Sequence, residues 1–301
     1  MRPIQLICAT TVPFMADGEL DVAGLGVLFR SILDSGVRHV FTPGTTGEFT
    51  GLSDEERLAV IEAALAVFGP EGVYAHVGAA TARQAAQLSA RARELGAMRL
   101  AAITPYFIKA GPTSIGDYYR AIVESAPGAE VYVYVFRARA STNVEPETLA
   151  TLSRIPGIAG AKISGLSTAE VVEYLSAVPA GFPVYSGNDR EFIRFARAGG
   201  AGIVSGVSGV FPGPFVRAEQ ALNDGTGDLE ALQREIDRCV DLVAGGDFAM
   251  LKLGVGLRGL PSGPLRIANE PPTADQIHTL AEAVRRGEGS MRTDCGDKDG
   301  K

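Results

Sequence analysis

The sequence of 301 residues has few cysteines and histidines and no long apolar run. Its three cysteines lie far apart and are odd in number, which argues against a disulfide framework and for a cytoplasmic protein in a reducing compartment. The three histidines are scattered without the spacing of metal ligands, so we expect no metal ion. No apolar run approaches the roughly 20 residues that span a bilayer, so we expect no membrane contact. The N-terminus is typical of a first strand and not of a signal peptide.

Basic charge is also scarce, with 28 Lys and Arg against 35 Asp and Glu, and the net charge is −7. This balance provides no domain-wide basic field, so nucleic acid is not an expected partner. An acidic protein that binds anions must use local donors instead. Glycine, by contrast, is abundant, at 37 residues without a collagen period, compared with the usual share of about 7%.

Eight short apolar runs alternate with longer amphipathic runs. Apolar strands separated by helices indicate a parallel sheet covered by helices. Eight such units within about 220 residues favour an α/β fold of the (β/α)8 TIM barrel type, although the pattern alone also allows an open doubly wound sheet. The expected strands are Ile4–Ala9, Val37–Phe41, Val73–Val77, Arg99–Ile103, Val131–Val135, Ile158–Lys162, Val184–Tyr185 and Gly202–Val204.

Several helices have recognisable start and stop signals. Ser53 and Glu56 have the spacing of a capping box, and Thr168 is expected to cap a later helix. Glycines follow three of the helices as stops, at Gly36, Gly69 and Gly96. We therefore predict a barrel over residues 1–225, a C-terminal helical region over 226–287 and a disordered tail over 288–301.

In a barrel, the chemistry takes place where strands end and βα loops begin. The segment Thr42–Glu48 follows the second strand with two hydroxyls and two glycines, which suits either an anion-binding loop or an ordinary turn. Lys162 closes the sixth apolar strand. A desolvated lysine has the lowered pKa that a Schiff-base nucleophile needs, whereas a lysine at a strand end can also extend to solvent. A lysine, hydroxyls and an anion loop at one barrel face are more specific together than any one alone.

These residues resemble a known family. The marks are Gly44–Glu48 in the sequence GTTGE, Thr104–Tyr106 in the sequence TPY, Tyr134, Gly160–Lys162 and Tyr185–Asp189. Over roughly residues 3–285 the chain resembles the dihydrodipicolinate synthase and N-acetylneuraminate lyase family of pyruvate-dependent class I aldolases. The resemblance implies a TIM barrel and Schiff-base chemistry that needs no cofactor.

The resemblance also implies roles for individual residues. Lys162 would form the Schiff base with pyruvate or another 2-keto acid, and Tyr134 would be the general acid and base. Thr45 would continue the proton relay to Tyr106, which in the family reaches across a dimer interface. Substrate contacts are implied for Thr45, Thr46, Gly47, Gly187 and Val204.

Departures from the synthase pattern concern the second substrate. Tyr134 would be followed by Asn-Val-Pro-Gly-Arg-Thr in the synthase branch, and here only Arg139 remains of that loop. Arg139 would bind the carboxylate of the aldehyde. Ser164, two residues after the lysine, resembles the lyase and sugar-acid aldolase branches, as do Asp189 and Glu191. These three residues are candidate contacts to substrate hydroxyls, or else local caps.

The sequence therefore predicts a Schiff-base lyase that joins or cleaves pyruvate and an aldehyde, with a 2-keto-3-deoxy sugar acid aldolase as the favoured activity. The first alternative is 4-hydroxy-tetrahydrodipicolinate synthase, which condenses pyruvate with aspartate semialdehyde. The second is a dehydratase of keto-deoxy sugar acids, and a third is a barrel that binds keto acids without turnover. The expected partners are the small-molecule substrate and further copies of the chain, in a homodimer or homotetramer.

Overall fold

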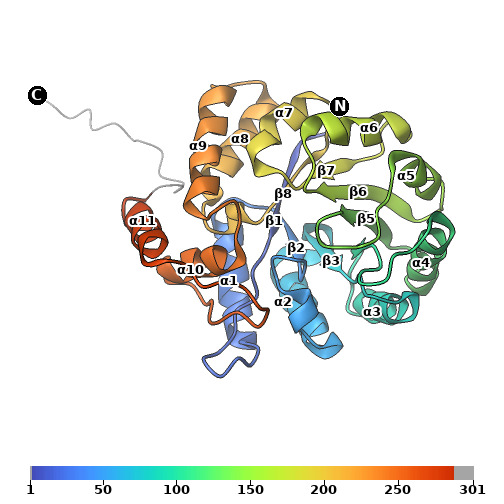
Figure 1. Ribbon diagram of the computed structural model, residues 1–301, viewed down its shortest axis with the longest axis horizontal. Coiled ribbons are helices and arrows are strands. Elements are labelled where there is room, and N and C mark those ends of the chain that lie inside the picture. Colours follow the sequence, from blue (N-terminus) through green and yellow to red (C-terminus); the bar gives the residue numbers. More distant parts are fainter. Residues whose placement is uncertain (1, 288–301) are drawn as a thin grey trace, which may run out of the picture.

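Eight parallel strands close into a barrel in chain order in the computed structural model, which describes residues 2–287. β8 pairs with β1 and completes the ring, and this closure excludes the open sheet (Figure 1). The prediction of a (β/α)8 barrel is confirmed. The strands are β1 Gln5–Ala9, β2 His39–Thr42, β3 Val73–His76, β4 Arg99–Ile103, β5 Glu130–Phe136, β6 Ile158–Ser164, β7 Val184–Ser186 and β8 Gly202–Ser205.

A helix follows each strand and lies outside the barrel (Figure 1). The expected strands match the observed ones to within two residues at each end. The helices are α1 Val22–Asp34, α2 Asp54–Gly72, α3 Ala82–Glu94, α4 Pro112–Ser125, α5 Pro146–Leu152, α6 Thr168–Ala177, α7 Phe192–Arg197 and α8 Pro212–Asp224.

Up to residue 287, three further helices follow the barrel: α9 Leu229–Leu242, α10 Phe248–Leu257 and α11 Ala274–Arg285. α9 packs on α8, and α11 packs on α9 and α10 (Figure 1). The C-terminal helical region is thus observed as helices, while its treatment as a separate unit from residue 226 onward stays a prediction. The disordered tail predicted over 288–301 lies outside the described residues.

Two layers of apolar side chains fill the molecule. The larger one lies between the strands and the helices. The smaller one is built from inward-facing residues of the strands and includes Phe41, Tyr74, Tyr132, Tyr134 and Tyr185. Tyr74 and Tyr132 meet edge to face with ring centroids 4.9 Å apart, so aromatic rings fill much of the barrel interior.

The expected helix signals agree with the structure except at the stop Gly69, since α2 continues to Gly72, and at one cap. Ser53 and Glu56 form the predicted capping box at the start of α2. Gly36, Gly69 and Gly96 all have positive φ, and Gly69 interrupts the helical geometry of α2. The cap of α6 is Ser167 and not Thr168, because Ser167 has the correct spacing to Glu170 for a reciprocal capping box.

Candidate active site

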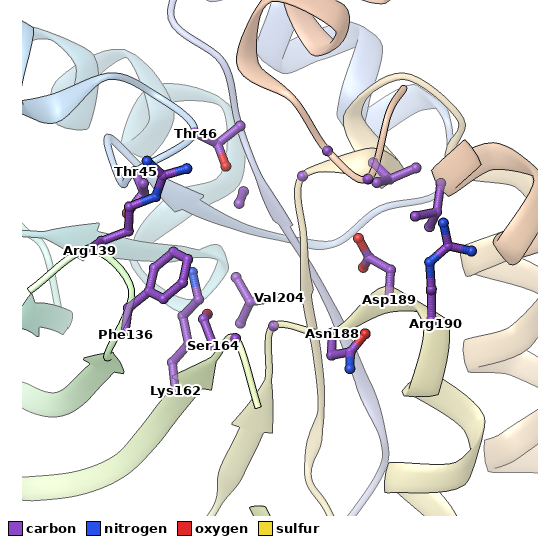
Figure 2. A pocket seen from close by; sticks show the side chains of 18 of the residues that line it. Thr45, Thr46, Phe136, Arg139, Lys162, Ser164, Asn188, Asp189, Arg190 and Val204 are labelled. Carbon is purple, nitrogen blue, oxygen red and sulfur yellow. The ribbon is translucent and has the colours of Figure 1, made fainter. Parts of the chain in front are cut away.

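A cavity of about 510 Å³ opens where the strands end and the βα loops begin (Figure 2). Strand ends supply Tyr134, Lys162, Ser164 and Val204 to its lining. The cavity therefore lies where the sequence predicts the chemistry. Its other predicted lining residues are Thr45, Thr46, Arg139, Gly187 and Asp189.

Lys162 and Tyr134 are direct neighbours in the register of β5 and β6. Both side chains point into the barrel, and the Lys162 Nζ lies 4.1 Å from the centroid of the Tyr134 ring and 4.2 Å from that of Phe41. Only 6% of Lys162 is exposed, and no carboxylate forms an ion pair with it among the described residues. Burial lowers the pKa of Lys162 to about 7, although the charge of Asp189 raises it in part. A large share of this amine is therefore neutral and nucleophilic near neutral pH.

Tyr134 connects the lysine to the loop after β2. Its hydroxyl lies 3.0 Å from the Thr45 Oγ1, within hydrogen-bond distance. Burial raises the pKa of Tyr134 to about 12, and the hydroxyls of Thr45 and Ser164 offset part of that effect. The phenol therefore keeps its proton, and it can pass that proton between the lysine side of the cavity and Thr45.

The loop after β2 contains backbone N–H groups that no acceptor in the described chain uses. Among the described residues, the backbone N–H groups of Thr45 and Thr46 have no acceptor, and both residues line the cavity. The next residues use theirs within the turn, since Gly47 N–H donates to the Gly44 carbonyl and Glu48 N–H to the Thr45 carbonyl. Free N–H groups and hydroxyls in one loop suit a carboxylate.

Glu48 anchors this loop to the C-terminal region. Its carboxylate is fully buried and pairs with Lys252 of α10 at 2.8 Å. The second oxygen accepts the backbone N–H groups of Arg266 and Ile267. A buried ion pair with these extra hydrogen bonds holds the loop in one position.

Asp189 lies across the cavity from Lys162 (Figure 2). Burial raises the pKa of Asp189 to about 7, against the opposing effects of the Ser205 hydroxyl and the cations of Lys162 and Arg190. One of its oxygens, Oδ1, is buried without a hydrogen-bond partner among the described residues. A carboxyl group of this kind can accept a hydrogen bond from a substrate hydroxyl or hold a proton.

Ser164 reaches the cavity because Gly187 makes room for it. A Cβ atom at Gly187 would lie 2.2 Å from the Ser164 Oγ, so a larger residue could not occupy that position without displacing the serine. We therefore interpret Gly187 as space for Ser164 as well as part of the lining.

Three of the residues predicted from the sequence do not line the cavity. The carboxylate of Glu191 accepts the backbone N–H of Thr168 at the start of α6 and lies 3.7 Å from Arg194. These contacts favour the alternative that Glu191 is a local cap, and its expected substrate contact stays a prediction. Gly47 serves packing, because a Cβ atom there would lie 3.1 Å from the Thr10 carbonyl oxygen.

Tyr106 is the third of these residues. It is half-buried, and its ring meets that of Phe49 edge to face at 5.7 Å. No hydrogen bond joins it to Thr45 within residues 2–287. Burial raises the pKa of Tyr106, and the Arg57 cation offsets this in part. The described chain alone therefore does not complete the expected relay.

The C-terminal region contributes a wall of the cavity that the sequence analysis missed. The only local signal was the glycine pair Gly245–Gly246, whose positive φ values of 76° and 90° reverse the chain between α9 and α10. Such a turn does not reveal which surface it approaches. The residues contributed by this region are Val240, Gly245, Gly246, Phe248 and Leu251.

Comparison with known proteins agrees with this geometry. The family model described as "Dihydrodipicolinate synthetase family" matches residues 2–286. A protein of Symbiobacterium thermophilum named 4-hydroxy-tetrahydrodipicolinate synthase is 30% identical over 93% of this chain and 96% of its own length.

Solved structures share the fold. YagE, a prophage protein of E. coli K12 crystallised with pyruvate, superposes with a TM-score of 0.86 at 24% identity, over 94% of this chain and 98% of its own. The wild-type sialic acid aldolase of Ruminococcus gnavus gives a TM-score of 0.86 at 21% identity, over 94% and 96%. Among the described residues, no helix is both long and apolar enough to cross a bilayer.

Proposed function

The chain belongs to the dihydrodipicolinate synthetase family of pyruvate-dependent class I aldolases, and from that premise we propose that it condenses pyruvate with an aldehyde that carries a carboxylate. The observation that carries the proposal is Lys162, a buried amine with a pKa near 7 beside the Tyr134 phenol. The relatives named 4-hydroxy-tetrahydrodipicolinate synthase favour this reaction over cleavage of a 2-keto-3-deoxy sugar acid.

The first step is imine formation. The neutral Lys162 amine attacks the keto carbon of pyruvate, the keto oxygen takes up protons, and water leaves. Thr45 and Thr46 hold the carboxylate of pyruvate through their hydroxyls and unused backbone N–H groups. Tyr134 supplies and recovers protons at the reacting carbon and oxygen, with Thr45 at 3.0 Å as its partner.

The second step joins the two substrates. The protonated imine lets the methyl carbon of pyruvate lose a proton and become an enamine. That carbon attacks the carbonyl carbon of the aldehyde, whose oxygen takes up a proton, and hydrolysis of the imine then releases the product and the free amine of Lys162. The reverse sequence cleaves the same bond, so one site supports synthase and lyase directions.

Arg139 is the proposed contact for the carboxylate of the aldehyde. It lines the cavity, and its guanidinium has no ion pair or hydrogen bond among the described residues. By contrast, the other arginine at this cavity, Arg190, is paired with Asp241 at 2.6 Å. A free guanidinium fits a carboxylate through two parallel N–H donors.

A hydroxylated 2-keto acid is the second candidate substrate. Ser164 and Asp189 favour it, because a hydroxyl that lines the cavity and a carboxylate oxygen without a partner among the described residues suit sugar hydroxyls. Cleavage of such a substrate would release pyruvate. Dehydration would consume the 2-keto acid and release water without forming pyruvate.

A substrate panel tests the proposal. We expect pyruvate consumption with aspartate semialdehyde, at a higher kcat/KM than pyruvate release from any 2-keto-3-deoxy sugar acid in the panel. Turnover confined to the sugar acids would replace the proposal by the second candidate. Binding of pyruvate without turnover of any substrate would contradict the proposal and indicate a barrel that binds keto acids without catalysis.

We also propose that the chain forms a homodimer through the loop after β4. Phe107 and Ile108 are 87% and 71% exposed, beside the half-buried Tyr106. Two large apolar side chains at one exposed loop suit burial against a second copy. A Phe107→Lys substitution should lower the sedimentation coefficient to that of a monomer, and an unchanged value would exclude this surface.

A further inference from the structure

Phe248 lies in the C-terminal region and still reaches the cavity. It is the first residue of α10, whose cap Asp247 accepts the backbone N–H of Met250 and binds the side chain of Asn269. Ala244, Gly245 and Gly246 have positive φ values and turn the chain so that this helix begins at the cavity. The turn and the helix start therefore place Phe248 at the cavity, although no strand of the barrel carries it.

Phe136 reaches the same place from the barrel. It lies two residues after Tyr134 on β5, so both rings face the interior. A Cβ atom at Gly165, which has a φ of +77°, would lie 3.0 Å from the Phe136 Cε2. A glycine at that position therefore makes room for the Phe136 ring beside the end of β6.

The guanidinium of Arg139 lies over both rings. Its Cζ is 5.9 Å from the centroid of Phe136 and 5.1 Å from that of Phe248 (Figure 2 shows Arg139 and Phe136). Both distances are within the range of a cation–π interaction. Arg139 itself comes from the βα loop after β5, where regular secondary structure does not hold its side chain.

A neighbouring arginine shows how such a side chain is otherwise held. Arg137, two residues earlier in the same loop, has three polar partners: Asn143 at 2.9 Å, Glu145 at 3.2 Å and the Tyr174 hydroxyl at 3.3 Å. Within residues 2–287, Arg139 has the two rings and no such polar partner. Aromatic contact keeps its N–H donors free, whereas polar partners occupy those of Arg137.

We propose that Phe248 is a positioning residue for the second substrate: with Phe136 it holds the Arg139 guanidinium so that its free donors face the carboxylate of the aldehyde. The inference rests on the proposed function, because it requires a carboxylated partner. It assigns the C-terminal helical region a part in substrate selection, since α10 supplies one of the two rings.

Two aldehydes of equal chain length isolate the effect. Succinic semialdehyde ends in a carboxylate, and butyraldehyde ends in a methyl group. For each enzyme variant, the ratio of kcat/KM for the acid to kcat/KM for the neutral aldehyde is measured from pyruvate consumption. A general disturbance of the cavity lowers kcat/KM for both aldehydes and leaves their ratio unchanged. A loss of arginine positioning lowers kcat/KM for the acid alone and therefore lowers the ratio.

Phe248→Leu keeps an apolar side chain and removes the ring. We expect it to lower the ratio about tenfold, the scale of one cation–π contact. Phe248→Tyr keeps the ring and should restore the ratio. Arg139→Ala should abolish the preference for the acid, and Arg139→Lys should restore little of it, because an ammonium neither stacks nor presents two parallel donors. Arg137→Ala, in the same loop but outside the cavity lining, is the matched control and should leave the ratio unchanged.

The outcomes separate this inference from the proposed function. If Arg139→Ala lowers the ratio and Phe248→Leu does not, the positioning role is wrong and the carboxylate contact stands. If Arg139→Ala leaves the ratio unchanged, or if the wild type does not prefer the acid, then both the inference and the choice of a carboxylated aldehyde are overturned. The imine chemistry of Lys162 is measured separately with pyruvate alone and does not depend on either result.

Discussion

On one side of the cavity, Lys162 and Tyr134 belong to adjacent strands of the barrel, whereas Arg139 and Phe248 come from a loop and from a helix outside the barrel. Strand register fixes the first pair, because Tyr134 and Lys162 are opposite each other on the hydrogen-bonded strands β5 and β6. The second pair depends on a nine-residue stretch between β5 and α5 and on the turn that starts α10. The difference indicates that the barrel determines the imine chemistry, while the surrounding elements determine what reacts with the enamine.

The electrostatics of the two sides differ in the same way. Lys162 is buried and without an ion pair, so its pKa is lowered toward neutrality. Arg139 is exposed at the mouth and remains available for an anion. The barrel side therefore supplies a nucleophile, and the mouth supplies a fixed positive charge.

The largest expected effect concerns the barrel side. Tyr134→Phe removes the phenol that lies 3.0 Å from Thr45. We expect kcat to fall about 10²- to 10⁴-fold, the usual contribution of general acid–base catalysis. Steady-state kinetics with pyruvate and the best aldehyde checks this. A loss below tenfold would remove Tyr134 from the proton relay.

The pH dependence follows from Lys162. Its pKa is lowered to about 7, and only the neutral amine attacks pyruvate. As pH falls below 7 the amine becomes protonated, so kcat/KM for pyruvate should fall about tenfold per pH unit and level off above pH 7. A profile that keeps rising to pH 10 would mean that the amine is not desolvated in the free enzyme.

The free energy of unfolding should rise with pH between about 7 and 10.5, because the cost of burying the charged amine of Lys162 falls over that range. The pKa of Lys162 is lower in the folded protein, about 7, than the 10.5 of a solvated lysine. The unfolded chain therefore binds more protons between these values, and the folded state pays the full cost below pH 7. Lys162→Met should therefore raise the free energy of unfolding by about 5 kcal/mol at pH 6 and by only about 1 kcal/mol at pH 10. Urea denaturation at the two pH values measures this, and an equal effect at both would exclude a lowered pKa.

The smallest expected effect concerns Glu191, which caps α6 and does not line the cavity. Glu191→Ala should change kcat/KM by less than about twofold and lower the free energy of unfolding by about 1 kcal/mol, as expected for the loss of a cap. Arg194→Ala, which removes the other polar neighbour of Glu191, serves as a control for the loss of charge at this surface. A tenfold loss of activity in Glu191→Ala alone would place Glu191 at the site after all.

The barrel and the strand-end residues could be predicted from the sequence because both depend on local patterns. Alternating apolar and amphipathic runs indicated the eight units. Lys162 closes one of the predicted apolar runs, and Thr45 lies in the loop that follows another. The register of β5 and β6 then brings Tyr134 beside Lys162, as the resemblance implied.

Phe248 could not be predicted in the same way, and the sequence left open whether Glu191 is a substrate contact or a local cap. Phe248 lies more than 80 residues after Lys162 in the chain, and only the packing of α9 and α10 on the barrel brings it to the cavity. Glu191 lies near Asp189 in the sequence, but the short helix that begins at Asp189 directs the two carboxylates to different partners. Side-chain direction in an irregular loop is a property of tertiary structure, which local patterns do not contain.

The central claim is that Lys162 forms an imine with pyruvate, and borohydride trapping tests it most directly. The wild type is incubated with pyruvate and sodium borohydride, and intact mass spectrometry is then used to look for one reduced pyruvate adduct, with Lys162→Met treated in parallel. The account predicts a single adduct on the wild type, mapped to Lys162 by peptide analysis, and none on the variant. No adduct on the wild type, or an equal adduct on Lys162→Met, would contradict it.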